Sequence, residues 1–476
     1  LNGLLSWHLT PDQSLDFEAG FSRQGNIYTG DTQNTNSNST VKNLLGHETN
    51  RSYRETYSVT HRGEWDFGSS MAYLQYEKTR NTRINEGLAG GTEGIFSNSE
   101  FYTAVLRDLT AHGEVNLPLR AGFEQTLTLG SEWSQQKLDD PSANTQSTSE
   151  GGAVGGLSSS NRSTQSSAQI FSLFAEDNIE LQPGTMLTPG LRLDHHSIVG
   201  DNWSPSLNLS HALSDTLTLK AGIARAYKAP NLYQLNSDYL LYSRGQGCYG
   251  QSTSCYLQGN DKLKAETSVN KELGLEYKAD GWVAGLTYFR NDYKNKVESG
   301  LAPVSHASGG SGAYRNSAIY QWENVPKALV EGLEGTLTIP LASQLTWNNN
   351  FTYMLQSKNK ETGDYLSVTP RYTLNSMLDW QATQDLSLQA TVAWYGQQTP
   401  KKYDYHGDRV TGSATQQLAP YAIAGVSGTY ALTRNLSLTA GVDNLFDKRL
   451  FREGNAQGVN NIAGAGAATY NEPGRT

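Results

Sequence analysis

Arginine and aromatic residues gather in the long polar segments of this sequence, where together they could bind an aromatic anion. Arginine combines a permanent charge with a planar face, and tyrosine adds a ring that can stack on the anion. The chain has a net charge of −9, so a local basic cluster would select anions. The alternative is that these are ordinary solvated loop residues. The candidates are Tyr28, Arg51, Tyr53, Arg54, Arg80, Arg83, Phe96, Tyr242, Arg244, Gln246 and Tyr249.

Catalytic motifs are missing from the sequence. It contains no G-x-S-x-G, no phosphate-binding loop, no H-E-x-x-H and no zinc-type cysteine pairs. The best acid–base candidate is Asp194-His195-His196, but neighbouring residues of a strand point to opposite faces. His47-Glu48, in a long loop, has no further support. We therefore predict no catalytic residues and no metal site.

The two cysteines are separated by seven positions in a glycine-rich polar segment. Such a pair indicates a local disulfide formed in an oxidising compartment. Two free thiols in a cytosolic loop are the alternative. The residues are Cys248 and Cys255.

Composition excludes several classes of protein. Only 37% of the 476 residues are apolar, mean hydropathy is −0.55, and no apolar run approaches the roughly 20 residues of a membrane helix. An outer-membrane barrel remains possible, because only alternate residues of its strands face lipid. With an acidic pI of about 5.5 and no basic stripe, nucleic acid is not an expected partner. A length prior suggests about three domains, but it is weak for all-β chains.

Apolar residues alternate with polar ones over many short segments, as expected of strands with one lipid-facing side. Tight turns separate paired segments, for example at Gln182-Pro183-Gly184-Thr185 and Ala279-Asp280-Gly281. The other links are long and polar, a difference typical of transmembrane barrels. About eight long-loop hairpins predict roughly 16 to 18 antiparallel strands. The long links lie near 26–50, 79–105, 137–167, 228–268, 295–325, 396–418 and 447–470.

Soluble all-β folds are the rival interpretation, because sandwiches, propellers and adhesins also alternate and use glycine-rich turns. No repeat of fixed period is visible, which weakens the propeller. Within the membrane class, a passive outer-membrane channel is the alternative to a ligand-specific receptor.

Several segments resemble the TonB-dependent ferric enterobactin receptors and related catecholate siderophore receptors, including the salmochelin receptors. The resemblance extends over essentially the whole chain, and 441–448 is similar to a segment near the end of TonB-dependent receptors generally. The matching segments are 23–28, 30–34, 48–51, 85–88, 242–248, 255–257, 288–293 and 470–475.

The resemblance implies a 22-stranded β-barrel in the outer membrane of a Gram-negative bacterium, with an N-terminal plug inside it. Such a receptor imports a ferric siderophore with energy from TonB-ExbB-ExbD, which would be reached through the N-terminal region. The iron would travel inside the siderophore, so no cofactor is expected. A receptor for a different iron chelate is the alternative. Outer-membrane lipid and lipopolysaccharide would surround the wall.

The resemblance also suggests roles for individual residues. Tyr28, Arg54, Arg83 and Phe96 match ligand-handling loops of the family, as do Arg244 and Gln246 in the cysteine-bearing loop. The full predicted ligand set adds Arg51 and Arg80, and Cys248 and Cys255 match the family's loop disulfide, which would stiffen a long loop.

Two departures from the family pattern concern the chain ends. The sequence starts inside a hairpin, where a plug would be expected to precede the barrel, and it stops before a final strand with a terminal aromatic residue. We expect residues 1–476 to be a partial barrel domain that lacks the plug and about four or five of 22 strands.

Overall fold

The computed structural model describes residues 1–27, 46–86, 96–141, 148–157, 161–243, 248–250, 253–403, 407–450 and 474–475, with backbone only at 85–86, 96–99, 326 and 413–414. Almost all regular structure in these ranges is β-strand. No helix there is long and apolar enough to cross a membrane.

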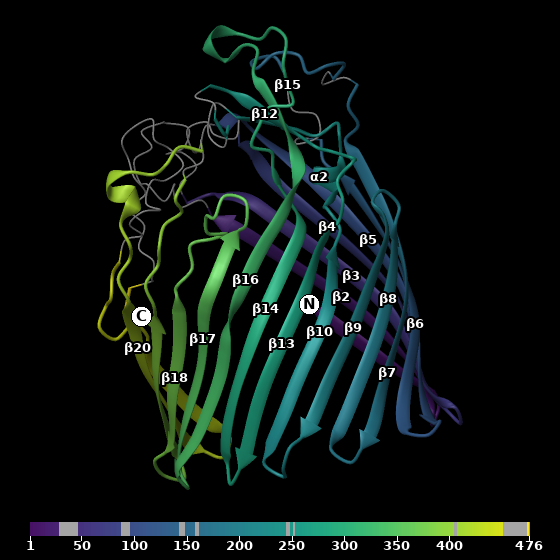
Figure 1. The fold of residues 1–476 in the computed structure, drawn as a ribbon, viewed down its shortest axis with the longest axis vertical. Coiled ribbons are helices and arrows are strands. Elements are labelled where there is room, and N and C mark those ends of the chain that lie inside the picture. Colours follow the sequence, from purple (N-terminus) through teal and green to yellow (C-terminus); the bar gives the residue numbers. More distant parts are fainter. Residues whose placement is uncertain are drawn as a thin grey trace.

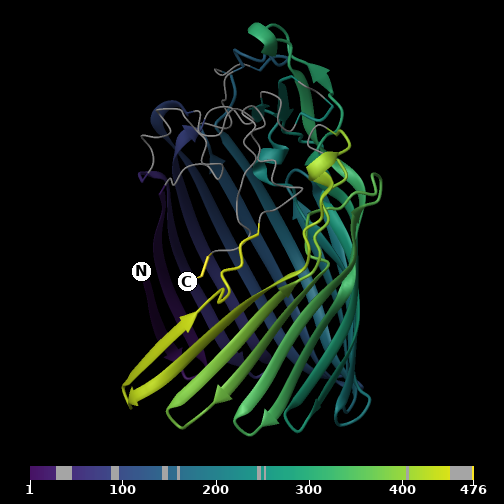
Figure 2. The same ribbon diagram turned by 90° about the vertical axis from the view of Figure 1, so that its left-hand side faces the viewer.

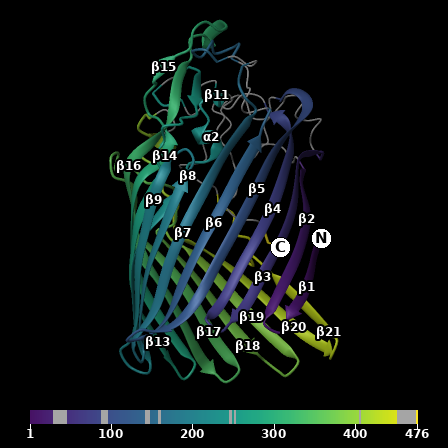
Figure 3. The ribbon, with the colours of Figure 1, turned by 90° about the vertical axis from the view of Figure 1, so that its right-hand side faces the viewer.

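Long antiparallel strands form one curved wall, in which each strand pairs with the next along the chain (Figures 1 and 3). Of the 21 strands in the described residues, all but β11, β12 and β15 belong to this wall, which leaves 18, as the hairpin pattern predicted. The wall strands are β1 (Asn2–Thr10), β2 (Gln13–Ile27), β3 (Glu48–Trp65), β4 (Gly68–Glu86), β5 (Phe96–Arg120), β6 (Glu124–Asp139), β7 (Gln165–Gln182), β8 (Thr185–His196), β9 (Gly200–Ala212), β10 (Leu217–Lys228), β13 (Glu266–Ala279), β14 (Trp282–Ser299), β16 (Ala318–Ala342), β17 (Leu345–Asn359), β18 (Tyr372–Gln381), β19 (Leu386–Tyr395), β20 (Tyr421–Thr433) and β21 (Leu436–Val442).

Tight turns close the hairpins at one end of the wall. Asp280 and Gly281 both adopt positive φ between β13 and β14, a conformation that glycine and aspartate tolerate. Gly184 does the same between β7 and β8. Both turns lie where the sequence predicted them.

Apolar side chains cover the outer face of the wall. Leu173, Leu191 and Trp203 are between 45% and 53% exposed, whereas Ser172 and Asp194 on the opposite face are at most 4% exposed. Asp194 accepts a hydrogen bond from the Ser172 hydroxyl at 2.5 Å. This arrangement, apolar outside and polar inside, is that of a transmembrane barrel and confirms the predicted fold class.

The two edge strands of the wall are β1 and β21; in Figure 2 the yellow β21 lies in the foreground and the purple β1 at the left of the view. In the described part of the chain β1 pairs only with β2, and β21 pairs only with β20. Pairing runs β10 to β13 and β14 to β16, because the strands numbered between them leave the wall.

A cap of loop segments covers the end of the wall opposite the tight turns (Figure 1). Its core consists of Leu240, Tyr242, Tyr256 and Ile319, each at most 2% exposed, together with Val154. In this cap β12 lies parallel to the start of β16. The cap elements are α2 (Leu232–Leu235), β11 (Leu240–Ser243), β12 (Cys255–Gln258), β15 (Ser305–His306) and the 3₁₀ turn η1 (Gly312–Tyr314), while a second 3₁₀ turn, η2 (Gly412–Thr415), lies between β19 and β20.

Candidate functional site

The predicted ligand residues that the structure describes lie on β3 and β4, near the cap end of the wall. Strand alternation divides them between the two faces. Arg54 shares a face with Glu77 and Asp108, which line a hollow inside the wall, whereas Arg51 and Arg80 share a face with Leu74 and Tyr57, which are 48% and 50% exposed outside. The structure therefore does not bring the four arginines into one cluster.

Arg54 and Arg83 face the lumen. The Arg54 guanidinium donates a hydrogen bond to a Glu77 carboxylate oxygen at 2.5 Å, although 58% of its side chain remains exposed. Arg83 is exposed and lies near α2 and the segment after it. Both arginines can therefore meet a ligand that enters from the cap end.

An aromatic pair accompanies Arg83 at the mouth of the lumen. The rings of Tyr233 and Tyr239 have centroids 5.3 Å apart, and the Tyr233 hydroxyl donates to Asp140 at 2.6 Å. Burial raises the pKa of the Tyr239 hydroxyl and Asp140 raises it further, while the charge of Arg83 acts in the opposite direction. A basic side chain beside two rings has the chemistry predicted for binding an aromatic anion.

Sequence reasoning did not single out Tyr233 or Tyr239. The sequence feature that could have identified them is the high number of tyrosines in one long polar link, because five lie within 228–268. The structure distinguishes structural tyrosines from candidate ligand contacts. Tyr256 and the predicted Tyr242 are buried in the cap core, where they support the fold.

Arg51 and Arg80 lie on the outer face. The Arg80 guanidinium is 5.1 Å from the centre of the Tyr53 ring and 3.3 Å from a Glu55 carboxylate oxygen. The Arg51 guanidinium is 5.0 Å from the centre of the Phe101 ring. These positions are separated by the wall from the lumen in which Arg54 lies.

The remaining predicted ligand residues fall where the structure gives no side-chain description. Tyr28, Arg244 and Gln246 lie outside the described residues, and only the backbone of Phe96 is described, at the start of β5.

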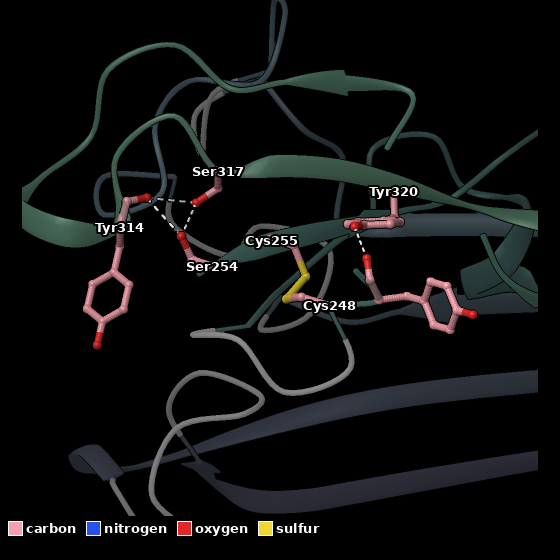
Figure 4. The surroundings of a disulfide bond; sticks show 7 residues. Cys248, Ser254, Cys255, Tyr314, Ser317 and Tyr320 are labelled. Atoms are coloured by element: carbon pink, nitrogen blue, oxygen red, sulfur yellow. Dashed lines mark hydrogen bonds between the residues drawn. A yellow bond between two sulfur atoms is a disulfide. The ribbon is translucent and has the colours of Figure 1, made fainter. Parts of the chain in front are cut away.

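The disulfide is confirmed. Cys248 and Cys255 are bonded, with their Cα atoms 5.8 Å apart (Figure 4). Both cysteines are buried against Ala318 and Tyr320 of β16. The Tyr320 hydroxyl donates to the Tyr249 carbonyl next to Cys248, and the Ser254 hydroxyl donates to the Tyr314 carbonyl at 2.9 Å. The disulfide thus closes the cysteine-bearing loop, and packing and hydrogen bonds hold the closed loop against the start of β16.

The lumen hollow below the cap has a volume of about 530 Å³ and carries carboxylates at Glu77, Asp108 and Glu132. In the ranges that the structure describes, no group of three or more His, Cys, Asp or Glu side chains is placed to hold a metal ion. His195 and His196 point to opposite faces, as argued from the sequence: His195 is exposed beside Asp201, and His196 is buried, with Nδ1 accepting from the Ile198 and Val199 amides.

Comparison with known proteins agrees with this architecture. The model of the family described as TonB dependent receptor-like, beta-barrel, matches residues 3–445. The chain belongs to this TonB-dependent receptor family. Its place is accordingly the outer membrane of a Gram-negative bacterium.

Two curated relatives of the TonB-dependent receptor family match the whole chain. A ferric enterobactin receptor of Pseudomonas aeruginosa is 83% identical over 478 residues, and the ferrienterobactin receptor of Escherichia coli is 58% identical over 489 residues. The chain spans 64% and 65% of their respective lengths. Both are receptors and not enzymes, which agrees with the lack of catalytic motifs.

Solved structures give the same result. A variant of the ferric enterobactin receptor of Pseudomonas aeruginosa, solved in complex with enterobactin, superposes with a TM-score of 0.94 and 83% identity, and the chain covers 68% of it. The siderophore receptor PirA of Acinetobacter baumannii superposes with a TM-score of 0.88 at 38% identity, with 69% of it covered. A copper transporter, at 18% identity and a TM-score of 0.68, shares the fold.

Proposed function

We propose that this barrel belongs to an outer-membrane receptor that imports a ferric catecholate siderophore, ferric enterobactin or a close relative of it. The observation that carries the proposal is the 83% identity to a receptor solved with enterobactin bound. Residues 1–476 would act as a partial barrel domain of that receptor. The iron would be held by the siderophore, and the protein would contact only the organic ligand.

Energy would come from TonB-ExbB-ExbD, as the family name and the sequence resemblance suggest. In receptors of this kind a plug region carries the contact with TonB. The polar inner face of the wall is suited to such a domain, because it offers carboxylates and guanidinium groups such as Glu77, Arg54 and Arg192.

The ligand contacts that we propose combine the lumen-facing and the loop residues. Ferric enterobactin is a trianion with three catechol rings, so it would be attracted by Arg54 and Arg83 and would stack near Tyr233 and Tyr239. We also retain the sequence-based candidates Tyr28, Phe96, Arg244 and Gln246, and place Arg51 and Arg80 outside the ligand path.

A solved variant of the Pseudomonas aeruginosa receptor supports the proposal that Arg244 and Gln246 contact the ligand. In that variant an arginine and a glutamine two positions apart are both replaced by alanine, and each has also been replaced singly in complexes with enterobactin. Arg244 and Gln246 are the only arginine and glutamine with this order and spacing in the present sequence. We therefore include both side chains among the proposed ligand contacts. Arg244 is substituted together with the two lumen arginines in the test below.

The test is ferric enterobactin binding and uptake by the complete receptor. We expect R54A/R83A/R244A to raise Kd at least tenfold, because the loss of even one charge-assisted contact costs roughly a factor of ten. The matched control is R51A/R80A, which removes two arginines of the same strands from the outer face and should leave Kd within about twofold. Unchanged binding by the triple variant, or equal loss in the control, would refute the site.

A further inference from the structure

Three cations lie directly opposite one another on adjacent strands of the wall. Lys78 of β4 pairs in register with Arg107 of β5, and Arg107 pairs with Lys137 of β6. Figure 3 shows these three strands side by side. Like charges directly opposite each other destabilise a sheet, so an anion at this place would offset the repulsion.

The row points away from the lumen. Lys78 shares its face with Leu74, and Lys137 shares its face with Leu129, both of which are exposed on the outside of the wall. Each cation has a sequence neighbour on the opposite face of its strand. These neighbours, Glu77, Asp108 and Gln136, line the lumen hollow. The row is thus separated from the proposed siderophore path.

The row has no acidic partner in the part of the chain that the structure describes. Glu55 lies opposite Lys78 in register, but its carboxylate is 3.3 Å from Arg80. None of the ion pairs of the described residues includes Lys78, Arg107 or Lys137. The cations thus have unused capacity to bind an anion.

One group of cations on the outer face is neutralised locally. On the β13–β14 side, Asp292 accepts from Arg290 at 2.9 Å and from Lys360 at 3.0 Å, and Lys271 lies 4.0 Å away. The row on β4 to β6 differs from this group, because no carboxylate forms an ion pair with its cations in the described residues.

A hollow of about 260 Å³ lies beside the row. Ser167 and Gln165 line it, as do Arg107 and Lys137. Asp139 is the one carboxylate among its lining residues, so the cations outnumber the acid. Such a hollow provides both charge and hydrogen-bond donors for an oxyanion.

The depth of the row matches the polar boundary of a membrane. On the outer face of β5, every residue from Leu119 to Leu109 is apolar or glycine, and Arg107 follows directly. A strand advances ~3.3 Å per residue and is tilted by about 40° from the barrel axis, so ten residues span roughly 25 Å along that axis. This is the height of the apolar band of such barrels. The row therefore lies just above that band, at the level of lipid headgroups.

We propose that Lys78, Arg107 and Lys137 bind the phosphate of a lipopolysaccharide molecule of the outer leaflet. The acyl chains would lie against Leu109 and the other outward apolar residues below, and the headgroup phosphate would occupy the hollow. This inference rests on the outer-membrane location of the barrel and not on the proposed siderophore.

The test is binding of purified lipid A by the complete receptor, measured by native mass spectrometry in detergent. The probes are lipid A with its phosphates, dephosphorylated lipid A, and inorganic phosphate alone. A basic residue near an anionic lipid surface contributes roughly fivefold in affinity, so K78Q/R107Q/K137Q should weaken binding of phosphorylated lipid A about 100-fold. The variant K78R/R107K/K137R, which keeps the charges, should retain most of the affinity.

The matched control is R62Q/K220Q/K278Q, which removes the same charge from the lumen side, where these cations lie beside Asp16 and Glu276. It should bind lipid A like the parent, and the outer-face triple variant should bind ferric enterobactin like the parent. Heat-modifiable migration in electrophoresis checks that each variant is folded. Three results would overturn the proposal: equal binding by the triple variant, equal binding of dephosphorylated lipid A, or inorganic phosphate binding as tightly as the lipid.

Discussion

At the scale of single residues, Arg54 in the lumen is partly neutralised before any ligand arrives. Arg54 contacts Glu77 inside the wall, and Arg80 contacts Glu55 outside it, so the two ion pairs on β3 and β4 are chemically alike but face opposite environments. Exposed ion pairs contribute little to stability, so the main effect of Glu77 should be on the local potential. The carboxylate reduces the attraction of Arg54 for an anion.

We predict that E77Q strengthens ferric enterobactin binding about two- to fivefold. The substitution frees the Arg54 guanidinium and removes a carboxylate that repels a trianion. Isothermal titration of the purified receptor measures the change, which should shrink at high salt. E55Q is the matched control, because it frees an arginine on the outer face only. Weaker binding in E77Q would contradict the placement of Arg54 in the ligand path.

At the scale of elements, the cap is a small structure with its own core. Tyr256 donates to the Gly152 carbonyl at 3.0 Å, and Asp140 receives the Tyr233 hydroxyl, so segments far apart in sequence are joined. Arg162 is buried here too, and burial lowers the pKa of its guanidinium, although Asp238 partly offsets this. The disulfide between Cys248 and Cys255 packs beside this core, against Ala318 and Tyr320 of β16.

We predict that C248S/C255S loosens the cap without weakening the wall. Opening a loop of this length costs about 2 kcal/mol in the chain-entropy description. Hydrogen exchange should therefore become faster in β11 and β12, while the amides of β13 and β14 keep their protection. Ala307→Ser, another change in the cap core, serves as a comparison that leaves the covalent link intact. Faster exchange throughout the wall would show that the disulfide stabilises the barrel itself.

At the scale of the whole molecule, one wall separates the lipid outside from the aqueous lumen inside. Residues that face lipid must be apolar over the height of the bilayer, whereas residues of the same strand that face the lumen can be polar or charged. On β6, Leu129 is 40% exposed on the outside and Ser134 lines the lumen hollow. The two positions are five residues apart on one strand.

We predict that L129R destabilises the folded receptor in lipid vesicles by about 2–4 kcal/mol, because it puts a charge near the middle of the bilayer. S134R should cost far less, because its side chain enters the aqueous lumen. Denaturant unfolding of the receptor in vesicles compares the two. An equal cost for both variants would be incompatible with the assigned faces.

The sequence was sufficient to predict the fold class, because alternation is a local property. The period of two, the turns at Gly184 and Gly281 and the local disulfide each depend on residues close together in the chain. The number of strands could also be predicted, because each hairpin is marked in the sequence by its own turn and contributes two strands. These features required no knowledge of distant contacts.

Tertiary structure alone decided which residues share a site. The sequence prediction grouped Arg51, Arg54, Arg80 and Arg83, but the register between β3 and β4 puts two of them on each face of the wall. It also gave no sign that Lys78, Arg107 and Lys137 would meet, because strand register determines which residues lie opposite one another. The physical reason is that register depends on the pairing of whole strands, whereas hydrophobic alternation is already present in each strand by itself.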